Sequence, residues 1–327
     1  MPKVLVTGAT GFAGSHLTKR LLSEGWDVRV LARPTSDTSR LELVGVEILT
    51  GDVTDEAVVR RAVKGINTVY HLAAVFRLAG LPDGAYWATN YHGTRNMLRA
   101  SLDAGVRRFI HCSTVGVHGH IEKPPADENA SYNPGDVYQR SKCEAEREAL
   151  RYYEEHGLPV TVIRPAGIYG PGDLRWLKLF RSIAGRRFVM LGSGDTFIHL
   201  VYISDLVDAF RLAADNPNAV GKVYIAAGER YVTLNELAGI IARVVGVPAP
   251  WLKVPVKPVR VLSGICEDVC RALRLEPPIF RRRVDFFVKN RAFDITRAKA
   301  ELGYSPKVDM EEGVTRTASW YREQGLL

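Results

Sequence analysis

A tyrosine and a lysine stand four residues apart in the stretch Tyr-Gln-Arg-Ser-Lys, at Tyr138 and Lys142. The surrounding sequence has a helical pattern, and residues four apart share one face of a helix. A free tyrosine titrates near pH ~10, and a neighbouring ammonium group lowers that pKa because it favours the phenolate. Such a pair can serve as a general acid and base near neutral pH, although most pairs of this kind on helices are plain surface residues.

A predicted strand over residues 109–113 directly precedes Thr114. In an open parallel sheet, ligands bind outside the carboxyl ends of the strands. Thr114 would then offer its hydroxyl where Tyr138 also points, and it could hydrogen-bond the substrate oxygen that Tyr138 protonates or deprotonates. We therefore predict that Thr114, Tyr138 and Lys142 form the catalytic group.

Three glycines, Gly8, Gly11 and Gly14, lie between a predicted strand over Lys3–Thr7 and a helical pattern that starts near Phe12. A glycine inside an element costs roughly 0.5–1 kcal/mol relative to alanine, so a function must offset that cost. Free backbone N–H groups and the positive end of a helix dipole form an anion site at such a junction. The pattern predicts a loop for the pyrophosphate of a dinucleotide, while a tight turn without a ligand stays open.

The elements that position these residues alternate along the chain. Predicted strands cover 3–7, 27–31, 46–50, 68–72, 109–113 and 160–164, and predicted helices cover 55–64, 85–104 and 137–156. Strands rich in valine and isoleucine with helical crossovers predict a parallel sheet covered on both faces, and right-handed crossovers make it doubly wound. We expect an α/β, Rossmann-type doubly wound parallel sheet as a dinucleotide-binding domain over residues 1–170.

Residues 171–327 are expected to form a smaller C-terminal substrate lobe, part of which returns to the sheet. Thr233 and Glu236 predict a capping box ahead of an apolar helix that ends at Val245. A proline-rich stretch over 248–258 is expected to bridge segments, and a last helix is predicted over 310–324.

The bulk composition is that of an ordinary globular protein of 327 residues, with 46% hydrophobic and 24% charged residues. A strand begins at residue 3 and no uncharged apolar run approaches 18 residues, so we expect a cytoplasmic protein without a signal peptide or a membrane partner. The cysteines, at 112, 143, 266 and 270, lack zinc-finger spacing and are expected to be buried or half-buried thiols in a reducing compartment.

The net charge is +8, and the densest basic cluster is Arg281-Arg282-Arg283. It lacks interleaved stacking aromatics, so we expect no nucleic-acid partner. The cluster is either a solvated face or the rim of a pocket for a phosphate or carboxylate. His118 and His120 have a spacing that can bind metal, but no third ligand stands near them, so we expect no metal site.

Read in order, a set of short motifs resembles the extended short-chain dehydrogenase/reductase family, also called the NAD-dependent epimerase/dehydratase group. The motifs lie at 7–14, 51–55, 71–74, 90–94, 113–114, 138 with 142, 164–171, 202–205, 294–299 and 302–304. Each motif alone is weak, and their order and spacing over nearly the whole chain carry the resemblance. It implies an enzyme that works on a small molecule with a nicotinamide cofactor.

The resemblance also implies a role for most motif positions. The pyrophosphate loop would consist of Gly8, Gly11, Phe12, Ala13 and Gly14. The adenine would lie against Asp52 and Val53, and the dinucleotide would be lined by Leu72, Ala73 and Ala74. The nicotinamide ribose would be held by Lys142, beside Tyr138, and the nicotinamide would lie beside Pro165 to Ile168. Asn90 is expected to fix the backbone between elements and to contact no ligand.

The end of the second predicted strand bears on the choice of cofactor. Family members that prefer NAD carry an acid there, which binds the ribose 2′-hydroxyl, but this chain has Ala32 followed by Arg33. Arginine suits a 2′-phosphate in shape and charge. We therefore favour NADP(H), with NAD(H) possible because Asp37 lies just beyond.

Departures from the family's motifs bear on the reaction. Sugar dehydratases carry acids after the catalytic threonine, where this chain has Val115 and Gly116. Many nucleotide-sugar enzymes carry an asparagine where Gly167 stands and an arginine near Ile198. The chain therefore looks like the dihydroflavonol-reductase-like and 3β-hydroxysteroid-dehydrogenase-like branch, which interconverts a secondary alcohol and a ketone.

Two alternatives stay open. One is a nucleotide-sugar epimerase of the UDP-sugar 4-epimerase type with tightly bound NAD, which Arg175 or the arginine cluster would serve by holding a diphosphate. The other is a binding protein that kept the fold and lost the chemistry. The complete set of Thr114, Tyr138 and Lys142 argues against it.

Candidate substrate contacts, from position, are Val75, Phe76, Arg77, Ser113, His118 and Arg175. The resemblance also suggests a homodimer packed through the helices at 85–104 and 137–156.

Overall fold

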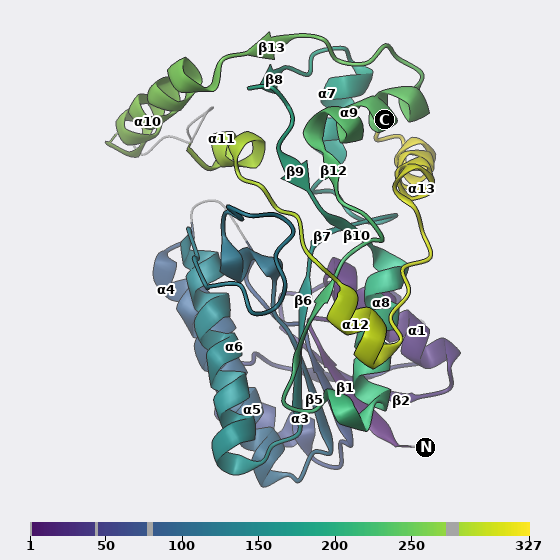
Figure 1. Ribbon diagram of the computed structural model, residues 1–327. Coiled ribbons are helices and arrows are strands. Elements are labelled where there is room, and N and C mark those ends of the chain that lie inside the picture. The colour runs from purple at the N-terminus through teal and green to yellow at the C-terminus, as the bar shows by residue number, and fades with distance from the viewer. Residues whose placement is uncertain (1, 43–44, 77–80, 273–280) are drawn as a thin grey trace.

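Seven parallel strands form the centre of the protein (Figure 1). The computed structural model describes residues 2–42, 45–76, 81–272 and 281–327. The strands are β1 (Lys3–Thr7), β2 (Asp27–Ala32), β3 (Glu47–Thr50), β4 (Thr68–His71), β5 (Arg108–Cys112), β6 (Val160–Pro165) and β11 (Val223–Ala226). Their order in the sheet is β11-β6-β5-β4-β1-β2-β3. The strand order reverses between β1 and β4, and in such sheets this switch point is where ligands bind.

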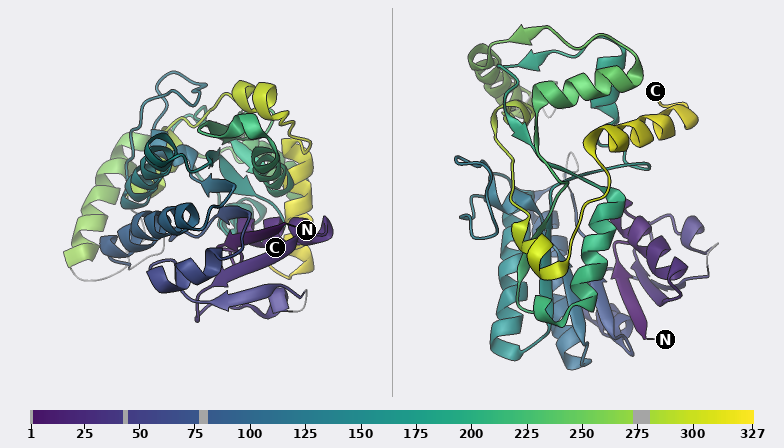
Figure 2. Two further views of the ribbon diagram at one scale, coloured as in Figure 1. Left: turned by 90° about the horizontal axis from the view of Figure 1, so that it is seen from below. Right: turned by 45° about the vertical axis from the view of Figure 1, so that its right-hand side comes forward.

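Helices cover both faces of the sheet, as expected for buried strands rich in valine and isoleucine. One layer is α1 (Phe12–Ser23), α8 (Ile203–Asp215) and α12 (Thr296–Leu302); the other is α3 (Glu56–Val63), α5 (Thr94–Asp103) and α6 (Val137–His156). A one-turn helix, α2 (Ser39–Glu42), follows β2. The right view of Figure 2 separates the two layers. The doubly wound Rossmann-type fold is thus confirmed.

A second lobe lies over the carboxyl ends of the strands (Figure 1). Its helices are α7 (Leu177–Ala184), α9 (Leu234–Val245), α10 (Val256–Ala272), α11 (Arg281–Val288) and α13 (Met310–Glu323). Short strands connect them: β7 (Gly167–Tyr169), β8 (Met190–Leu191), β9 (Phe197–Ile198), β10 (Leu200–Tyr202), β12 (Val232–Thr233) and β13 (Lys253–Val254). The chain after residue 170 also returns to the large sheet, because β11 is its edge strand and α8 covers one face.

Two local expectations need correction. The helix expected over 85–104 is three joined segments: α4 (Asp83–Tyr86), the π-helical η1 (Trp87–Gly93) and α5. The buried Asn90 in η1 accepts from the Val75 N–H at 2.7 Å and donates to the Val75 carbonyl at 3.1 Å, so it fixes that backbone. The capping box is half formed: Thr233 accepts from the Glu236 N–H at 3.1 Å, but the Glu236 carboxylate pairs with Arg230 at 2.5 Å.

A buried ion pair joins β6 to α6. Arg164 and Glu146 have exposed side-chain fractions of 2% and 0%, and Arg164 Nε donates to both Glu146 oxygens at 3.1 and 3.2 Å. Glu146 also accepts from the hydroxyls of Tyr132, at 2.7 Å, and Ser113. Burial alone would lower the pKa of Arg164, but the hydrogen bonds and charge of Glu146 raise it above its ordinary value. Arg164 therefore keeps its charge in the interior.

Replacing Arg164 by leucine is expected to lower the free energy of unfolding by about 3–5 kcal/mol, because Glu146 would be left as an uncompensated buried charge. Urea unfolding followed by circular dichroism measures this. The matched control is Arg243→Leu, which breaks the exposed ion pair with Glu311 at 3.0 Å and is expected to cost about 1 kcal/mol or less. Equal losses in the two variants would contradict the role assigned to the buried pair.

Candidate active site

The turn between β1 and α1 packs so closely that side chains have no room. Gly8 has a φ of +76°, and a Cβ there would lie 2.8 Å from the Ala73 nitrogen at the end of β4. A Cβ on Gly14 would lie 2.1 Å from the Gly8 carbonyl oxygen. Gly11 caps α1 without a side-chain hydrogen bond, so the first N–H groups of the helix are left for an anion. These observations fit the pyrophosphate of a dinucleotide.

A buried histidine, His71, connects this turn to the neighbouring elements through hydrogen bonds. His71 lies between two hydroxyls, with Nδ1 2.8 Å from Thr7 Oγ1 and Nε2 2.9 Å from Thr94 Oγ1. Thr7 Oγ1 in turn accepts from the Ala73 N–H at 3.2 Å. Burial, with a smaller contribution from the charge of Lys142, lowers the pKa of His71 to about 3. The neutral ring therefore holds β1, β4 and α5 together, a role that the sequence pattern did not reveal.

Tyr138 and Lys142 lie on the buried face of α6. Asp136 starts this helix by accepting from the Gln139 N–H at 2.8 Å. Lys142 is 2% exposed, and its ammonium donates to the Cys112 carbonyl at the end of β5, at 2.7 Å. Burial lowers the pKa of Lys142 below its ordinary value, while Cys112 and Glu146 act in the opposite direction. The ammonium is thus fixed beside the strand that leads to Thr114.

Thr114 begins the 3-10 turn η2 (Val115–His118) that follows β5. Its Oγ1 accepts from the Gly116 N–H at 3.0 Å. Accepting this bond leaves the hydroxyl hydrogen of Thr114 available to donate. The end of β5 and the first turns of α6 thus bring the three expected catalytic residues to one edge of the sheet.

An aromatic and cationic cover lies over Tyr138. The Phe76 ring meets the Tyr138 ring edge to face, with centroids 4.9 Å apart. The Arg175 guanidinium lies 5.6 Å from the Phe76 ring centre and 5.5 Å from that of Phe12. Buried Asp173 holds Arg175 with two hydrogen bonds, at 2.7 and 3.1 Å. Arg175 therefore connects the glycine turn with the aromatic ring on Tyr138.

Two other expected substrate contacts turn away from the site. His118 is buried; its Nδ1 lies 3.2 Å from the Ser131 carbonyl and its Nε2 lies 2.9 Å from Arg164 Nη1. Ser113 is buried and donates to Glu146. Because protein groups occupy both ring nitrogens and the Ser113 hydroxyl, we withdraw His118 and Ser113 from the substrate contacts. They belong to the network around the buried ion pair.

The expected adenine end lies at the ends of β2 and β3. Arg33 is exposed directly after β2, and Val53 is buried. The Asp52 carboxylate accepts from the Thr54 N–H and hydroxyl, both at 2.9 Å. Asp37 accepts from the Ser39 N–H at 3.0 Å and from its hydroxyl at 2.7 Å, so this carboxylate is engaged locally. Arg33 is thus an exposed cation at the expected ribose end.

The remaining expected contacts follow the strand ends. Leu72, Ala73, Ala13 and Phe12 are half-buried, Ala74 is exposed, and Val75 and Pro165 are buried. Ile168 is half-buried, and its carbonyl accepts from Arg175 and Trp176 at 3.1 and 2.9 Å. Arg77 lies outside the described residues, as do the side chains of Arg281, Arg282 and Arg283.

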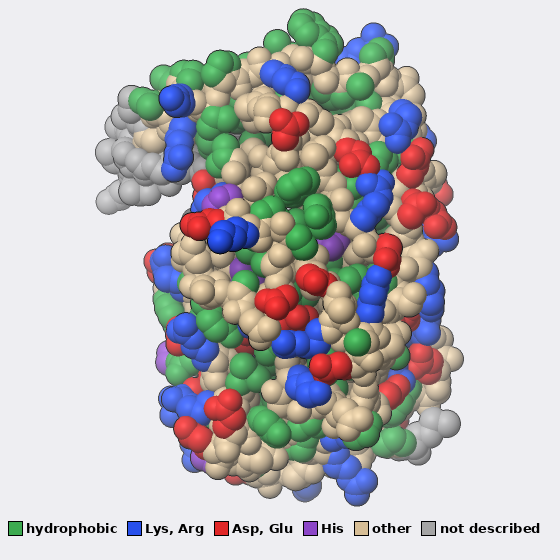
Figure 3. Space-filling view, viewed as in Figure 1, with side chains coloured by type: hydrophobic (Ala, Val, Ile, Leu, Met, Phe, Trp, Pro, Cys, Tyr) green, Lys and Arg blue, Asp and Glu red, His purple; other side chains and the backbone are tan. Residues whose placement is uncertain are grey.

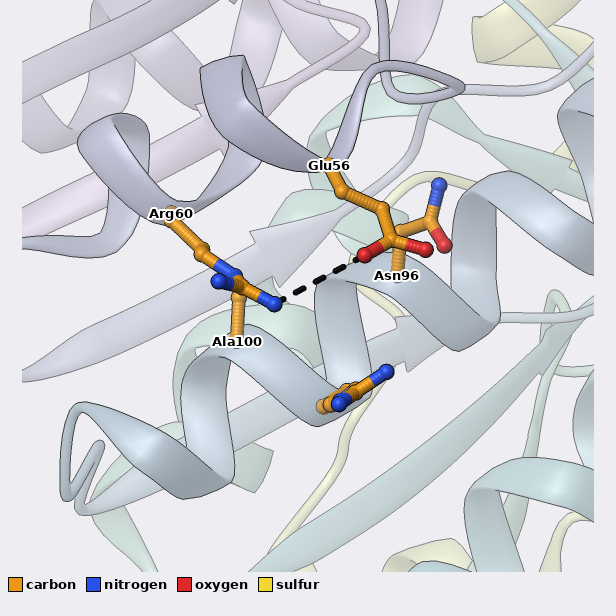
Figure 4. Close-up of a pocket in the computed structure, with 5 residues that line it drawn as sticks. Glu56, Arg60, Asn96 and Ala100 are labelled. Carbon is orange, nitrogen blue, oxygen red and sulfur yellow. Dashed lines mark ion pairs between the residues drawn. The ribbon is translucent and has the colours of Figure 1, made fainter.

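A small pocket between α3 and α5 is a separate feature (Figure 4). It is lined by Glu56, Arg60, Asn96, Arg99 and Ala100 and has a volume of about 10 Å³, roughly what one water requires. Glu56 and Arg60 pair across 3.6 Å, and Asn96 donates to the Val53 carbonyl at 3.1 Å. The Asn96 contact ties α5 to the loop after β3, the ion pair lies within α3, and the pocket leaves no room for a substrate.

Within the described residues, no three His, Cys, Asp or Glu side chains are grouped to hold a metal ion. Instead, His120 Nδ1 accepts from the Asn290 N–H at 3.1 Å. Cys112, Cys143 and Cys266 are free thiols. No helix in the described part of the chain is long and apolar enough to cross a membrane.

The geometry defines a dinucleotide-binding α/β protein with a tyrosine and a lysine beside the switch point, and comparison with known proteins agrees. A model of the NAD dependent epimerase/dehydratase family matches residues 4–227. The 3 beta-hydroxysteroid dehydrogenase/Delta 5-->4-isomerase of Mycobacterium tuberculosis is 31% identical over 339 residues, 98% of this chain and 90% of that protein. Sterol demethylase protein B of Methylococcus capsulatus is 28% identical over 332 residues, 99% of each.

A solved structure extends this likeness to three dimensions. The UDP-glucose 4-epimerase of Thermotoga maritima, in a structure with UDP-glucose, is similar with a TM-score of 0.80 and 26% identity, over 98% of this chain and 99% of that chain. The chain belongs to the NAD dependent epimerase/dehydratase family, the extended short-chain dehydrogenases/reductases. It is accordingly an NAD-dependent enzyme of the dehydrogenase, reductase or epimerase kind.

Gly14→Ala is expected to weaken dinucleotide binding about tenfold or more, because overpacking costs about 1–3 kcal/mol and the new Cβ would press on the Gly8 backbone. Fluorescence titration with NADH and NADPH measures the affinity. Gly239→Ala in α9 is the matched control, since a Cβ there meets nothing within 4 Å. Unchanged affinity in Gly14→Ala would contradict the close approach assigned to this turn.

Proposed function

We propose that this protein is an oxidoreductase that interconverts a secondary alcohol and a ketone, with Tyr138 as the acid and base and NADP(H) as the preferred cofactor. The observation that carries the proposal is the buried Lys142 ammonium, held on the Cys112 carbonyl at 2.7 Å one helical turn from Tyr138. An ammonium fixed there favours the phenolate form of a neighbouring tyrosine. That is what a tyrosine needs in order to exchange a proton near neutral pH.

Each residue of the site has a separate role in the proposed reaction. The bound nicotinamide supplies the hydride acceptor or donor. In the direction of reduction, Tyr138 gives its phenolic proton to the carbonyl oxygen, and Thr114 donates its hydroxyl hydrogen to the same oxygen. Lys142 holds the nicotinamide ribose and stabilises the phenolate that remains. The Phe76 ring covers the tyrosine, and Arg175 lies over that ring.

The site supports a net oxidoreductase over an epimerase through Gly167. Many nucleotide-sugar enzymes of the family carry an asparagine at this position. Here a Cβ on Gly167 would lie 2.6 Å from the Leu200 side chain, so Leu200 fills the place of a longer side chain. The buried Ile198 stands where an arginine would contact phosphate. The site thus lacks two polar contacts that a sugar diphosphate would use.

The second candidate function is nucleotide-sugar epimerisation with tightly bound NAD. Similarity to the Thermotoga maritima epimerase favours it, and exposed Arg175 and Lys178 could bind a diphosphate. The nucleotide that co-purifies with the protein, released by denaturation and identified by mass, separates the two candidates. Tightly retained NAD supports the epimerase, because an enzyme that recycles its cofactor does not release it. An empty protein that binds NADPH more tightly than NADH supports the oxidoreductase.

We also propose that the enzyme is a cytoplasmic homodimer packed through residues 85–104, which α4, η1 and α5 cover, and through α6. Support comes from the family resemblance, since these helices form one outer layer of the sheet domain (Figure 2). Light scattering during size-exclusion chromatography tests the dimer.

Tyr138→Phe is expected to leave cofactor affinity nearly intact and to lower the turnover of ketone reduction on the order of 100-fold or more, because the acid and base is lost. Steady-state kinetics with NADPH and a panel of ketones measures the turnover, and fluorescence titration measures the affinity. Full activity in this variant would eliminate the proposed mechanism.

The double substitution Ala32→Asp with Arg33→Ala is expected to move cofactor preference toward NAD. The new carboxylate at position 32 can accept a hydrogen bond from the ribose 2′-hydroxyl of NAD and repels the 2′-phosphate of NADP. The second substitution removes the Arg33 guanidinium, which would otherwise bind that phosphate. The measurement is the ratio of NADPH and NADH affinities in the wild type and the variant. If that ratio does not change, Arg33 does not contact the 2′-phosphate.

A further inference from the structure

Large apolar side chains are exposed at the end of the lobe that carries β13 and α10. Trp251 is 83% exposed, Leu252 43%, Val261 63% and Leu262 62%. Exposed apolar patches on a protein surface mark interaction sites. Figure 3 shows hydrophobic and basic side chains together along this end of the molecule, which is farthest from the N-terminus. We call the exposed side chains of residues 251–262 the lobe-end surface.

The first turns of α10 have an apolar face with cations at its border. Pro258, Val261 and Leu262 are exposed and lie three and four residues apart, so they share one face of the helix. Lys257 and Arg260 are exposed in the same turns, while Ser263 is buried and faces the protein. The helix therefore presents apolar and basic side chains to solvent together.

The charged residues in this part of the chain, residues 237–266, are all basic. Residues 237–266 contain no Asp or Glu, but they contain Arg243, Lys253, Lys257 and Arg260. Arg243 pairs with Glu311 at 3.0 Å, and Lys253 donates to the Ser193 carbonyl at 2.7 Å. Lys257 and Arg260 are the two cations that accompany the apolar face. Apolar side chains bordered by cations are complementary to an interface that has anionic groups above hydrocarbon.

We propose that the lobe-end surface docks on a bilayer that contains anionic phospholipids. A tryptophan is well suited to the level of the headgroups, and an amphipathic helix with basic residues lies in that plane with its apolar face inward. Protein interfaces are depleted in lysine, so the lysines here favour lipid over a protein partner. The expected absence of a membrane partner rested on spanning segments, and peripheral docking requires none.

The test is co-sedimentation of the whole protein with vesicles, either of phosphatidylcholine alone or of phosphatidylcholine with about one third phosphatidylglycerol. We expect binding to the anionic vesicles, and we expect this binding to weaken as salt is raised, because salt screens the attraction. Lys257→Gln with Arg260→Gln is expected to reduce the partition coefficient on the order of 30-fold. Trp251→Ser is expected to reduce it on the order of tenfold.

The matched control is Lys64→Gln with Arg99→Gln, which removes the same charge from two exposed positions, one directly after α3 and one within α5. Both helices belong to the sheet domain, away from the lobe that carries α10 (Figure 1). Its partition coefficient should stay within about twofold of the wild type. Unchanged NADPH affinity in every variant shows that the fold and the cofactor site are intact, so the result does not depend on the proposed reaction. Failure to bind anionic vesicles, or an equal loss in the control, would overturn the proposal. A dimer that Trp251→Ser converts to a monomer would also overturn it, because a second copy would then cover the surface.

Discussion

The buried ion pair between Arg164 and Glu146 is the contact on which the geometry of the site depends. Glu146 lies one helical turn beyond Lys142 and two turns beyond Tyr138, so its position sets how α6 lies against the sheet. Arg164 belongs to β6, and the Ser113 hydroxyl brings the end of β5 to the same carboxylate. Ion pairs withdrawn from water are stable only when their remaining hydrogen bonds are satisfied. Tyr132, His118 and the Glu128 carbonyl provide these bonds here, which restricts the elements to one arrangement.

That arrangement determines where the Lys142 charge lies. A lone buried ammonium is costly, and this one is compensated by the Cys112 carbonyl and by the charge of Glu146. The same charge lowers the pKa of the two buried histidines nearby, His71 and His111, after the larger effect of burial. Both rings are therefore neutral, and the Lys142 ammonium is held at the end of β5, one helical turn from Tyr138.

The sequence predicts much of the sheet domain because its signals are local. Alternating strands and helices predict the six strands that the first 170 residues contribute to the large sheet to within a residue or two, and the helix over 137–156 to the residue. Distant contacts decide what it misses. The π-helical turn at Asn90 forms because its amide binds the Val75 backbone, 15 residues away in the chain. His118 follows β5 in the sequence, but its direction is set by Arg164, 46 residues later.

The contacts of Arg175 add a link between the cofactor turn and the substrate side. Its guanidinium lies over Phe12, which opens α1 at the glycine turn, and over Phe76, whose ring covers Tyr138. The His16 ring meets Phe12 edge to face and lies 3.1 Å from the Pro171 carbonyl, so the loop that carries Arg175 is anchored to α1 at a second point. A displacement of the glycine turn would therefore move the aromatic cover of Tyr138 with it. Arg175 and His16 thus link the glycine turn to the loop after β7 and to the aromatic ring that covers Tyr138.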